Sequence, residues 1–362
     1  MILMVCSSMF QLFTAIAIKE VFLKDKKVDL CLTDITPAFS GLCKNPILLN
    51  IFDEVIFSPI TENISKLSRI EKSYYFNAIY DKAPKYYVKR IWGNDIEKKY
   101  DELYFSIYLK HNIMLAKCIK KAHKNARVHI FEDGISTYLI DDKTLANNDE
   151  KLDAQSYIDD IYMFEPKLMC LDTDKPLIKI PSLDKYPEIA KVLNEIFENA
   201  DYEIKEKFVF FEESFNNDGY KTNDAELIET LNDIAKDEFI LKHHPRNRVD
   251  RFKEKMNTIE VPMMWEQYFL KHSIDDKVLV TVSSNTAFVP KIINNSRPYV
   301  IFLYKLFTGT SPIFESGNFY KYTDKYLKLY KDYAEEKIFI PETYEEYKEI
   351  IKKLMNKEEE IK

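Results

Sequence analysis

Glycine is scarce in this chain. Only 6 of the 362 residues are glycine, and they are Gly41, Gly93, Gly134, Gly219, Gly309 and Gly317. A Rossmann dinucleotide fingerprint needs three closely spaced glycines, and a P-loop needs two followed by Lys and Ser or Thr. Neither motif can be built from these positions. A bound phosphate would therefore have to be held by side chains and helix amino termini instead of a glycine cradle.

Other motifs are missing as well. The five cysteines are widely spaced and form no CxxC pair, which fits reduced thiols in a cytosol. The sequence holds no HExxH motif or histidine cluster that would indicate catalytic zinc. A GxSxG nucleophile elbow is also absent. We therefore expect no metal cofactor and no serine hydrolase.

Long apolar runs are missing too. None approaches the ~20 residues of a membrane span, and the first six residues, 1–6, are too short and lack the basic lead of a signal peptide. A net charge of −7 argues against a nucleic-acid binder. We expect a cytoplasmic protein. The segment 82–99 mixes Lys, Arg, Tyr and Trp92 and could attach to the inner face of the cytoplasmic membrane, although a solvated amphipathic segment is the competing interpretation.

Short β-rich runs alternate with helical patterns, as in α/β proteins. We predict strands at 2–6, 28–33, 54–57, 103–106 and 128–131 in the first half, and at 208–211, 239–242, 278–282 and 299–303 in the second. Helical periodicity predicts helices at 10–22, 112–123, 224–235, 265–270 and 286–293. This alternation predicts two successive α/β units, each with a parallel sheet.

The joint between the units is predicted from prolines. Four of them fall between Pro166 and Pro187, where periodicity is weak, and we place the linker near residues 180–200. The expected domains are residues 1–185 and 186–362. The charged tail 343–362 has apolar positions at helical spacing and should form a helix that docks on one of the domains, the N-terminal one being the candidate.

One glycine stands beside two acids. Glu132, Asp133 and Gly134 follow the apolar run 127–131, so two adjacent carboxylates come at the end of a strand, before a residue free to take any backbone angle. This arrangement suits an acid/base group on a tight turn. A helix N-cap after a strand is the alternative.

Two further segments lie at predicted strand ends in the second half. Lys242, His243, His244 and Pro245 follow one strand, at the edge where α/β folds bind ligands. Ser283 and Ser284 end the next strand and precede a helix, which is typical of an anion site.

Each segment also has a structural interpretation. The histidines could be packed at a strand end, and the serines could be an ordinary helix cap. A third segment, 261–266, places Glu266 between the other two, 22 residues after His244 and 17 before Ser283.

Taken in order, these motifs resemble those of bacterial sialyltransferases, whose shared pattern is an acid pair with glycine, then His-Pro, then a Ser-Ser or Ser/Thr pair. The opening 5–12, Val-Cys-Ser-Ser-Met-Phe-Gln-Leu, is similar to that of the lipooligosaccharide sialyltransferases, glycosyltransferase family 52. Ser8 and Met9 stand where that family usually has Thr-Pro. The resemblance spans residues 1 to about 310, and the polysialyltransferase and Pasteurella-type families share the short motifs.

The resemblance implies a GT-B fold, in which two Rossmann-like domains with parallel sheets face a central cleft. It implies an inverting transfer of sialic acid from CMP-sialic acid, without a metal, to a hydroxyl of a terminal sugar such as galactose. The acceptor would be a bacterial surface glycan such as lipooligosaccharide or capsule. It also implies a homodimer.

The resemblance assigns roles to the motif residues as well. Glu132 is the expected general base, with Asp133 as second choice, and Asp218 after the first strand of domain two is a further candidate. His244 is the expected general acid or phosphate donor. The groups expected to bind the donor nucleotide are Lys242, Pro245, Glu266, Ser283 and Ser284, with Glu266 accepting from the ribose hydroxyls.

Two other functions compete with this one. Asp172 and Asp174 have the Asp-x-Asp spacing that chelates a divalent metal beside a UDP-sugar diphosphate, although they fall in the proline-rich joint. A non-catalytic α/β binding protein is the second competitor.

Overall fold

The structure is a computed structural model of the full chain. It describes all residues except 77–82, 94, 107–108, 140–154, 197–201, 248, 253, 260–263, 310–317, 336 and 357–362. Two compact units are present. Unit 1 comprises Met1–Pro181 with Lys191–Ile196, and unit 2 comprises Ser182–Ala190 with Phe197–Lys362. The helix α11 (Pro187–Ile196) therefore begins in one unit and ends in the other.

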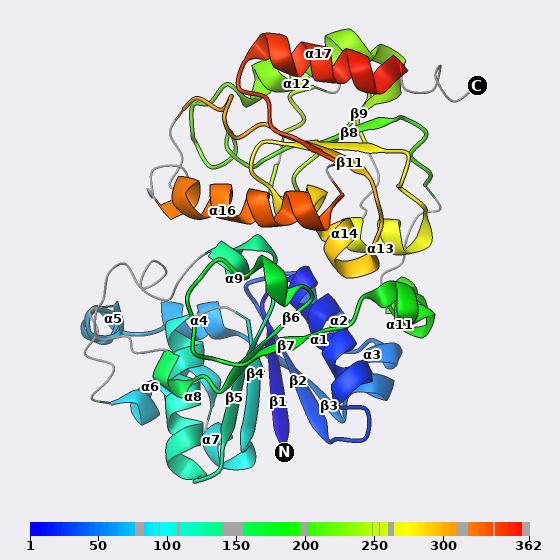
Figure 1. The fold of residues 1–362 in the computed structure, drawn as a ribbon. Coiled ribbons are helices and arrows are strands. Elements are labelled where there is room, and N and C mark those ends of the chain that lie inside the picture. The colour runs from blue at the N-terminus through cyan, green and yellow to red at the C-terminus, as the bar shows by residue number, and fades with distance from the viewer. Residues whose placement is uncertain are drawn as a thin grey trace. The chain divides into compact units, whose positions relative to one another are not determined.

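Unit 1 is built on a parallel sheet of seven strands in the order β3-β2-β1-β4-β5-β6-β7 (Figure 1). The strands are β1 (Ile2–Cys6), β2 (Val28–Thr33), β3 (Glu54–Ser58), β4 (Glu102–Phe105), β5 (Arg127–Phe131), β6 (Asp160–Met163) and β7 (Leu177–Lys179). The order reverses between β1 and β4, as in a Rossmann fold, and ligands of such sheets bind beyond the carboxyl ends of the strands at this reversal.

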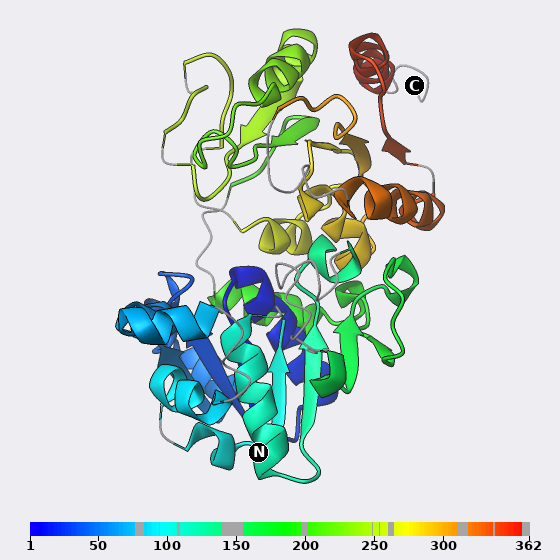
Figure 2. The ribbon, with the colours of Figure 1, turned by 90° about the vertical axis from the view of Figure 1, so that its left-hand side faces the viewer.

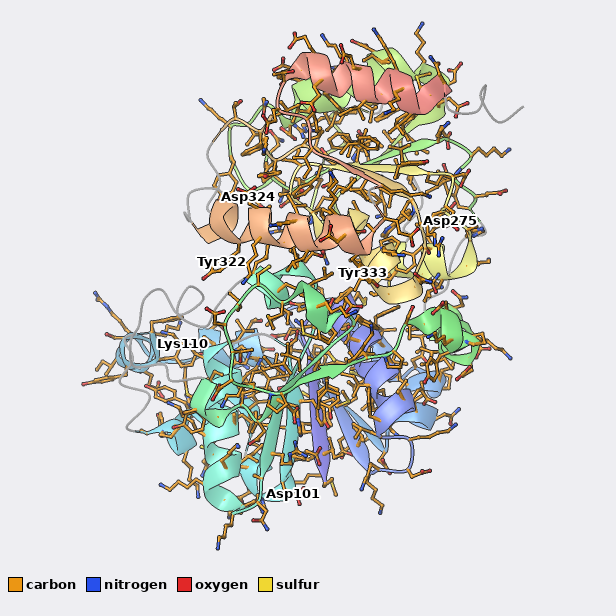
Figure 3. The ribbon with its side chains drawn as sticks, in the orientation of Figure 1. Asp101, Lys110, Asp275, Tyr322, Asp324 and Tyr333 are labelled. Atoms are coloured by element: carbon orange, nitrogen blue, oxygen red, sulfur yellow. The ribbon has the colours of Figure 1, made fainter. Side chains whose placement is uncertain are left out.

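The helices of unit 1 cover the sheet. They are α1 (Met9–Phe22), α2 (Phe39–Leu42), α3 (Pro46–Ile51), α4 (Ile60–Ser65), α5 (Arg69–Phe76), α6 (Pro84–Trp92), α7 (Ile96–Lys99), α8 (Lys110–Ala122) and α9 (Ile135–Leu139). Buried side chains of α6 and α8 pack on alternate residues of β1, β4 and β5, such as Leu3, Leu103 and Val128. Lys110 donates a hydrogen bond of 2.8 Å to the Phe76 carbonyl, which ties α8 to the end of α5 (Figure 3).

Unit 2 has a parallel sheet of five strands in the order β12-β11-β10-β8-β9. The strands are β8 (Phe208–Phe211), β9 (Phe239–Lys242), β10 (Val278–Thr281), β11 (Tyr299–Phe302) and β12 (Ile338–Phe339). Numbered within the unit, this is the flavodoxin-like order 2-1-3-4-5, which reverses between β8 and β10. The helices are α12 (Asp224–Ala235), α13 (Trp265–Lys271), α14 (Val289–Asn294), α16 (Asn318–Tyr333) and α17 (Tyr344–Met355) (Figure 2).

The predicted α/β class with a parallel sheet in each half is confirmed. Sequence analysis missed β6, β7 and β12. The proline-rich stretch from Pro166 to Pro187 holds β7, which pairs with β6, so it is not a simple linker. The tail helix is present as α17, whose Tyr347 hydroxyl donates 3.4 Å to the Leu227 carbonyl of α12, so this helix packs within unit 2. No described helix is both long and apolar enough to cross a bilayer.

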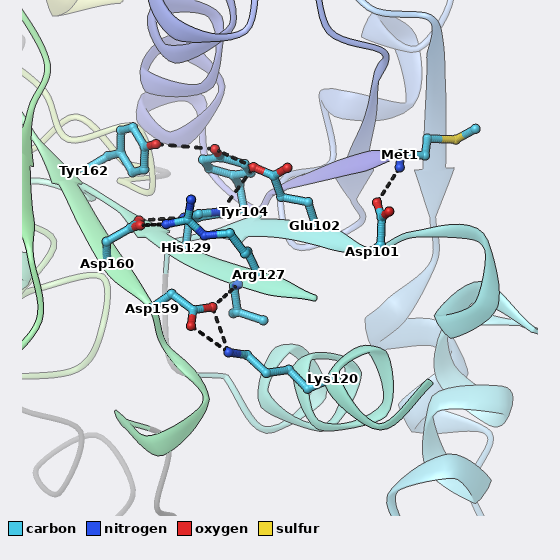
Figure 4. A network of polar contacts seen from close by, with 11 residues as sticks. Met1, Asp101, Glu102, Tyr104, Lys120, Arg127, His129, Asp159, Asp160 and Tyr162 are labelled. Atoms are coloured by element: carbon cyan, nitrogen blue, oxygen red, sulfur yellow. Dashed lines mark hydrogen bonds and ion pairs between the residues drawn. The ribbon is translucent and has the colours of Figure 1, made fainter. Parts of the chain in front are cut away.

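A charge network with His129 and Asp160 buried at its centre lies at the amino ends of β4, β5 and β6 (Figure 4). His129 is fully buried, with Nδ1 2.5 Å from Asp160 and Nε2 3.1 Å from Glu102. Its ring stacks on Tyr104 with centroids 4.2 Å apart. Arg127 pairs with the second Asp160 oxygen at 2.6 Å. Burial alone would lower the pKa of His129, but the two carboxylates outweigh burial and raise it, so this end of the sheet carries a structural ion cluster.

Candidate active site

Glu132 lies directly after β5 and its side chain is 1% exposed. Its Oε2 accepts hydrogen bonds from the Tyr138 hydroxyl at 2.6 Å and from the Phe164 amide at 2.7 Å. Burial raises the pKa of this carboxyl to about 7, against the opposing effect of these two donors. The Glu132 side chain therefore joins β5 to α9 and to the residue after β6, and is directed into unit 1.

Asp133 is partly exposed, and its carboxylate belongs to a different set of contacts. Oδ2 accepts a hydrogen bond of 3.0 Å from Gln11 Nε2, and Oδ1 accepts one of 3.3 Å from the Ser8 hydroxyl. Burial raises the pKa of Asp133, and the two donors partly offset this. Gly134 takes φ +69°, a left-handed angle that glycine adopts without strain, so the acid pair does lie on a tight turn.

The chain opening is therefore part of the same site. Ser8 is the N-cap of α1 and accepts from the Gln11 amide at 3.2 Å, while the Gln11 Oε1 accepts from the Ser7 amide at 2.6 Å. These bonds fix Gln11, which is 2% exposed, with its Nε2 toward Asp133. The sequence indicated both the opening and the acid pair, but it did not predict that they contact each other.

His244 follows β9 and is partly buried. Its Nδ1 accepts a hydrogen bond of 3.1 Å from the Arg246 amide, which places the ring proton on Nε2. Burial, followed by the positive charge of Arg246, lowers the pKa of His244 to about 4. At neutral pH the ring is therefore a neutral donor through Nε2. Pro245 lies in the turn that this contact closes, and it is exposed.

His243 is engaged in an ion network instead. Its Nδ1 lies 2.7 Å from Glu212 and its Nε2 lies 3.0 Å from Asp250. Arg251 pairs with the other Glu212 oxygen at 2.9 Å and with Asp224 at 2.6 Å. The hydrogen bond that His243 donates to Glu212 is the main cause that raises the pKa of His243, whereas burial lowers the pKa of His244, so the two adjacent histidines differ in environment.

Lys242 ends β9 and Glu266 lies in the first turn of α13. Both side chains are partly buried, and burial lowers the pKa of Lys242 and raises that of Glu266, while each charge opposes the shift of the other. The structure thus brings these two predicted residues into electrostatic contact. Residues 261–263 of the predicted segment lie outside the described residues.

Ser283 and Ser284 follow β10 at the reversal of the sheet order. The Ser284 hydroxyl caps the 3-10 turn Asn285–Ala287 and lies 2.7 Å from the Thr286 hydroxyl. The predicted helix 286–293 begins with this turn, and α14 starts only at Val289.

Glu213 was missed by sequence analysis. Its Oε1 accepts from the Ser283 amide and the Ser283 hydroxyl, both at 3.0 Å, and from the Thr281 hydroxyl at 3.3 Å. The signal that could have found it is the same as for Glu132 and Asp133, namely two adjacent acids, Glu212 and Glu213, directly after a predicted strand.

The remaining predicted acids lie elsewhere. Asp218 is exposed. It accepts a hydrogen bond of 2.6 Å from the Ser214 hydroxyl and lies 3.4 Å from Arg246. Its hydrogen bond with Ser214 is the main cause that lowers its pKa. Asp172 and Asp174 are exposed in the segment before β7. In the part of the chain that the structure describes, no three His, Cys, Asp or Glu side chains are grouped to hold a metal ion.

Comparison with known proteins shows the fold. No family model and no curated protein matches the chain. Solved structures do match over almost its whole length. A glycotransferase of kitacinnamycin has a TM-score of 0.54 at 9% identity, covering 98% of this chain and 90% of that one. The spinosyn rhamnosyltransferase SpnG, complexed with thymidine diphosphate, has a TM-score of 0.52 at 9% identity, with 98% and 91% covered.

A sialyltransferase is among these structures. The α/β-galactoside α-2,3-sialyltransferase of Photobacterium phosphoreum has a TM-score of 0.50 at 10% identity, covering 94% of this chain and 98% of that one. These proteins are glycosyltransferases of the GT-B class. At such identities the likeness establishes the fold alone, and this chain has the α/β fold of GT-B glycosyltransferases.

Proposed function

We propose that the protein is an inverting, metal-independent sialyltransferase that uses CMP-sialic acid as donor. The observation that carries the proposal is the position of the motif residues. Asp133 lies next to the carboxyl end of β5, and His244 and Ser283 follow β9 and β10, beside the reversal of strand order in unit 2. Ligands of doubly wound sheets bind at these ends.

In the proposed reaction, unit 1 supplies the base. An acceptor hydroxyl gives its proton to a carboxylate while its oxygen forms the bond to the anomeric carbon and the bond to the CMP oxygen breaks. Exposure supports Asp133 for this role over Glu132, because Glu132 is 1% exposed and Asp133 is partly exposed. The order expected from the sequence is thereby reversed in the proposal.

Unit 2 supplies the contacts to the leaving phosphate. His244 would donate through Nε2 as a neutral ring, and Lys242 would contribute positive charge, with Ser283 and Ser284 beside it. A nucleoside monophosphate carries less charge than a diphosphate, so these donors can meet the charge that develops on the leaving oxygen. Glu266 would accept hydrogen bonds from the ribose hydroxyls.

The acceptor in this proposal is a terminal sugar such as galactose on a bacterial surface glycan, and the enzyme is a homodimer, as the resemblance implies.

We also propose peripheral attachment to an anionic membrane. In the segment named from the sequence, Tyr87, Val88 and Ile91 are buried. Tyr86 of that segment is 48% exposed, and the preceding helix α5 adds two outward apolar side chains, Ile70 at 69% and Phe76 at 57% exposure.

Incubation of the purified protein with CMP-, UDP- and GDP-sugars tests the proposal. We expect turnover of CMP-sialic acid alone, and turnover of a UDP-sugar without the CMP donor would overturn the proposal.

Sedimentation with anionic vesicles, compared with neutral vesicles, tests the membrane attachment. The paired variants Ile70→Ser and Phe76→Ser should reduce binding to anionic vesicles, whereas Val249→Ser, which removes an apolar side chain that is 70% exposed in unit 2, should not.

A further inference from the structure

Glu213 places a carboxyl group where the proposed function needs an anion site. It lies in the turn after β8, the strand between β10 and β9. One carboxylate oxygen accepts three hydrogen bonds. They come from the Ser283 amide, the Ser283 hydroxyl and the Thr281 hydroxyl, at 3.0, 3.0 and 3.3 Å. The Ser283 donors that would meet a phosphate are therefore already used by an internal anion.

The described surroundings of Glu213 hold no cation paired with it. Apart from those three donors, the Ser284 amide also faces it from the turn after β10. From the β9 side, His243 and Arg251 are directed to Glu212, and Arg246 lies against Asp218 and Ser214. Among the described residues, no Lys, Arg or His forms an ion pair with Glu213. Burial accordingly raises the pKa of this carboxyl above its usual value, against the four donors.

An ionised Glu213 and a bound phosphate cannot both be satisfied at Ser283. A hydroxyl has one proton to donate, and while it donates to Glu213 it presents only lone pairs to a phosphate oxygen. Two anions sharing one set of donors also repel each other, and the first response of such a pair is that one of them takes up a proton.

We propose that Glu213 is a positioning residue that competes with the donor phosphate for Ser283, so that phosphate binding is coupled to protonation of Glu213. The inference rests on the proposed function. The carboxylate takes one proton from solvent, and as a neutral acid it accepts hydrogen bonds more weakly. The Ser283 hydroxyl then turns its proton to the phosphate, while the amide of Ser283 can still donate to Glu213 and hold the turn.

Calorimetry on the full chain with cytidine 5′-methylphosphate tests the coupling. This phosphodiester resembles the donor linkage and keeps a single negative charge across neutral pH, so it contributes no proton change itself. Titrations in two buffers of different ionisation enthalpy report the protons taken up. For the wild type we expect uptake approaching one proton, and an affinity that falls by up to ~10-fold per pH unit where Glu213 ionises in the free protein.

Two variants identify the group that takes up the proton when the ligand binds. Glu213→Gln should bind with no proton uptake and should be tighter than the wild type at pH 8, with little difference at pH 5. Glu229→Gln makes the same change of charge on α12, at a side chain that is 46% exposed, and should behave as wild type. If the Gln variant fails to fold, wild-type binding without proton uptake still overturns the inference.

The outcomes separate the two claims. Wild-type binding of cytidine 5′-methylphosphate without proton uptake overturns the inference and leaves the proposed function standing. Uptake that persists unchanged in Glu213→Gln also overturns it, because another group then takes the proton. Absence of binding to either protein at pH 5 and pH 8 overturns both claims.

Discussion

Gln11 donates a hydrogen bond of 3.0 Å from Nε2 to Asp133 Oδ2, across 122 residues of sequence. The bond joins the first turn of α1, the helix that follows β1, to the turn after β5. In the sheet β1 and β5 lie on opposite sides of β4. The donor favours the ionised form of Asp133 and so opposes the effect of burial on its pKa. Gln11 should therefore set the pH range over which Asp133 acts as a base.

Gln11→Glu tests this directly. The substitution keeps an oxygen for the Ser7 amide but replaces the donor to Asp133 with a second acid. The pKa of Asp133 should rise further, so the acid limb of the profile of kcat/KM against pH should move to higher pH. A profile that coincides with that of the wild type would contradict the role. Gln11→Leu, which removes the donor without adding charge, should shift the limb in the same direction by less.

The two adjacent acids should respond differently to neutral substitutions. Asp133→Asn should lower kcat by about 10²–10⁴-fold, because it removes the proposed base, with little change in CMP affinity. Glu132→Gln should mainly reduce stability, since its carboxylate ties Tyr138 and Phe164 together. Steady-state kinetics together with urea unfolding of both variants separate the effects. A larger loss of kcat in Glu132→Gln, at unchanged stability, would restore the order expected from the sequence.

The two histidines before Pro245 should titrate far apart. His244 should lose its proton at about pH 4, and His243 should remain charged above its usual range because Glu212 hydrogen-bonds to it. Imidazole ¹⁵N NMR, assigned with His243→Gln and His244→Gln, measures both values. In the ligand-free protein His244 should show the Nε2–H tautomer at pH 7. A charged His244 at that pH would favour a general acid over a neutral hydrogen-bond donor.

The His129 cluster should stabilise unit 1 in a pH-dependent way. Because its folded pKa is raised, the contribution of His129 is fully present below the unfolded value of ~6.5 and is lost as the pH rises through the folded value. His129→Asn should cost about 3 kcal/mol at pH 6, since it removes a partner from the buried Asp160.

The two tryptophans make this measurable. Trp92 lies in unit 1 and Trp265 in unit 2, so a Trp265→Phe background leaves Trp92 to report urea unfolding of unit 1. The difference between variant and wild type should shrink as the pH rises from 6 through the raised folded pKa of His129. A difference that stays constant across this range would show that packing on Tyr104, and not charge, is what His129 contributes.

Chelation should leave turnover unchanged. The proposal uses Lys242, His244 and hydroxyls at the phosphate, and Asp172 and Asp174 are exposed before β7 without a third acid among the described residues. Turnover of CMP-sialic acid in EDTA, compared with added Mn²⁺, measures this. Loss of activity in EDTA together with loss in Asp174→Asn would favour the metal-dependent UDP-sugar alternative.

Much of the fold was predictable because most strands are buried apolar runs with ordinary lengths. The strands β8 and β9 match their predicted bounds, and so does α12. The missed strands have weaker patterns. β7 has three residues next to Pro176, β12 has two, and β6 begins with the buried charge Asp160, which only its ion pairs explain.

The candidate site was predictable as a set of strand ends, and less so in its contacts. The sequence cannot reveal that Asp133 is partly exposed while Glu132 is buried, since both follow the same strand. Glu213 was missed for a related reason. Its importance comes from the parallel pairing of β8 with β10, a relationship between residues 70 positions apart that no local pattern records.

β8 lies between β10 and β9 in its sheet, so the two residues that follow β8 connect the ends of both neighbouring strands. Glu212 bonds to His243 on one neighbouring strand end, and Glu213 bonds to Ser283 on the other. Substitutions at His243 and at Ser283 would each disturb the same two-residue turn, so their effects on stability should not add. Homologues that change one of these three strand ends should then carry compensating changes in the other two, and the segments should be inherited as a block.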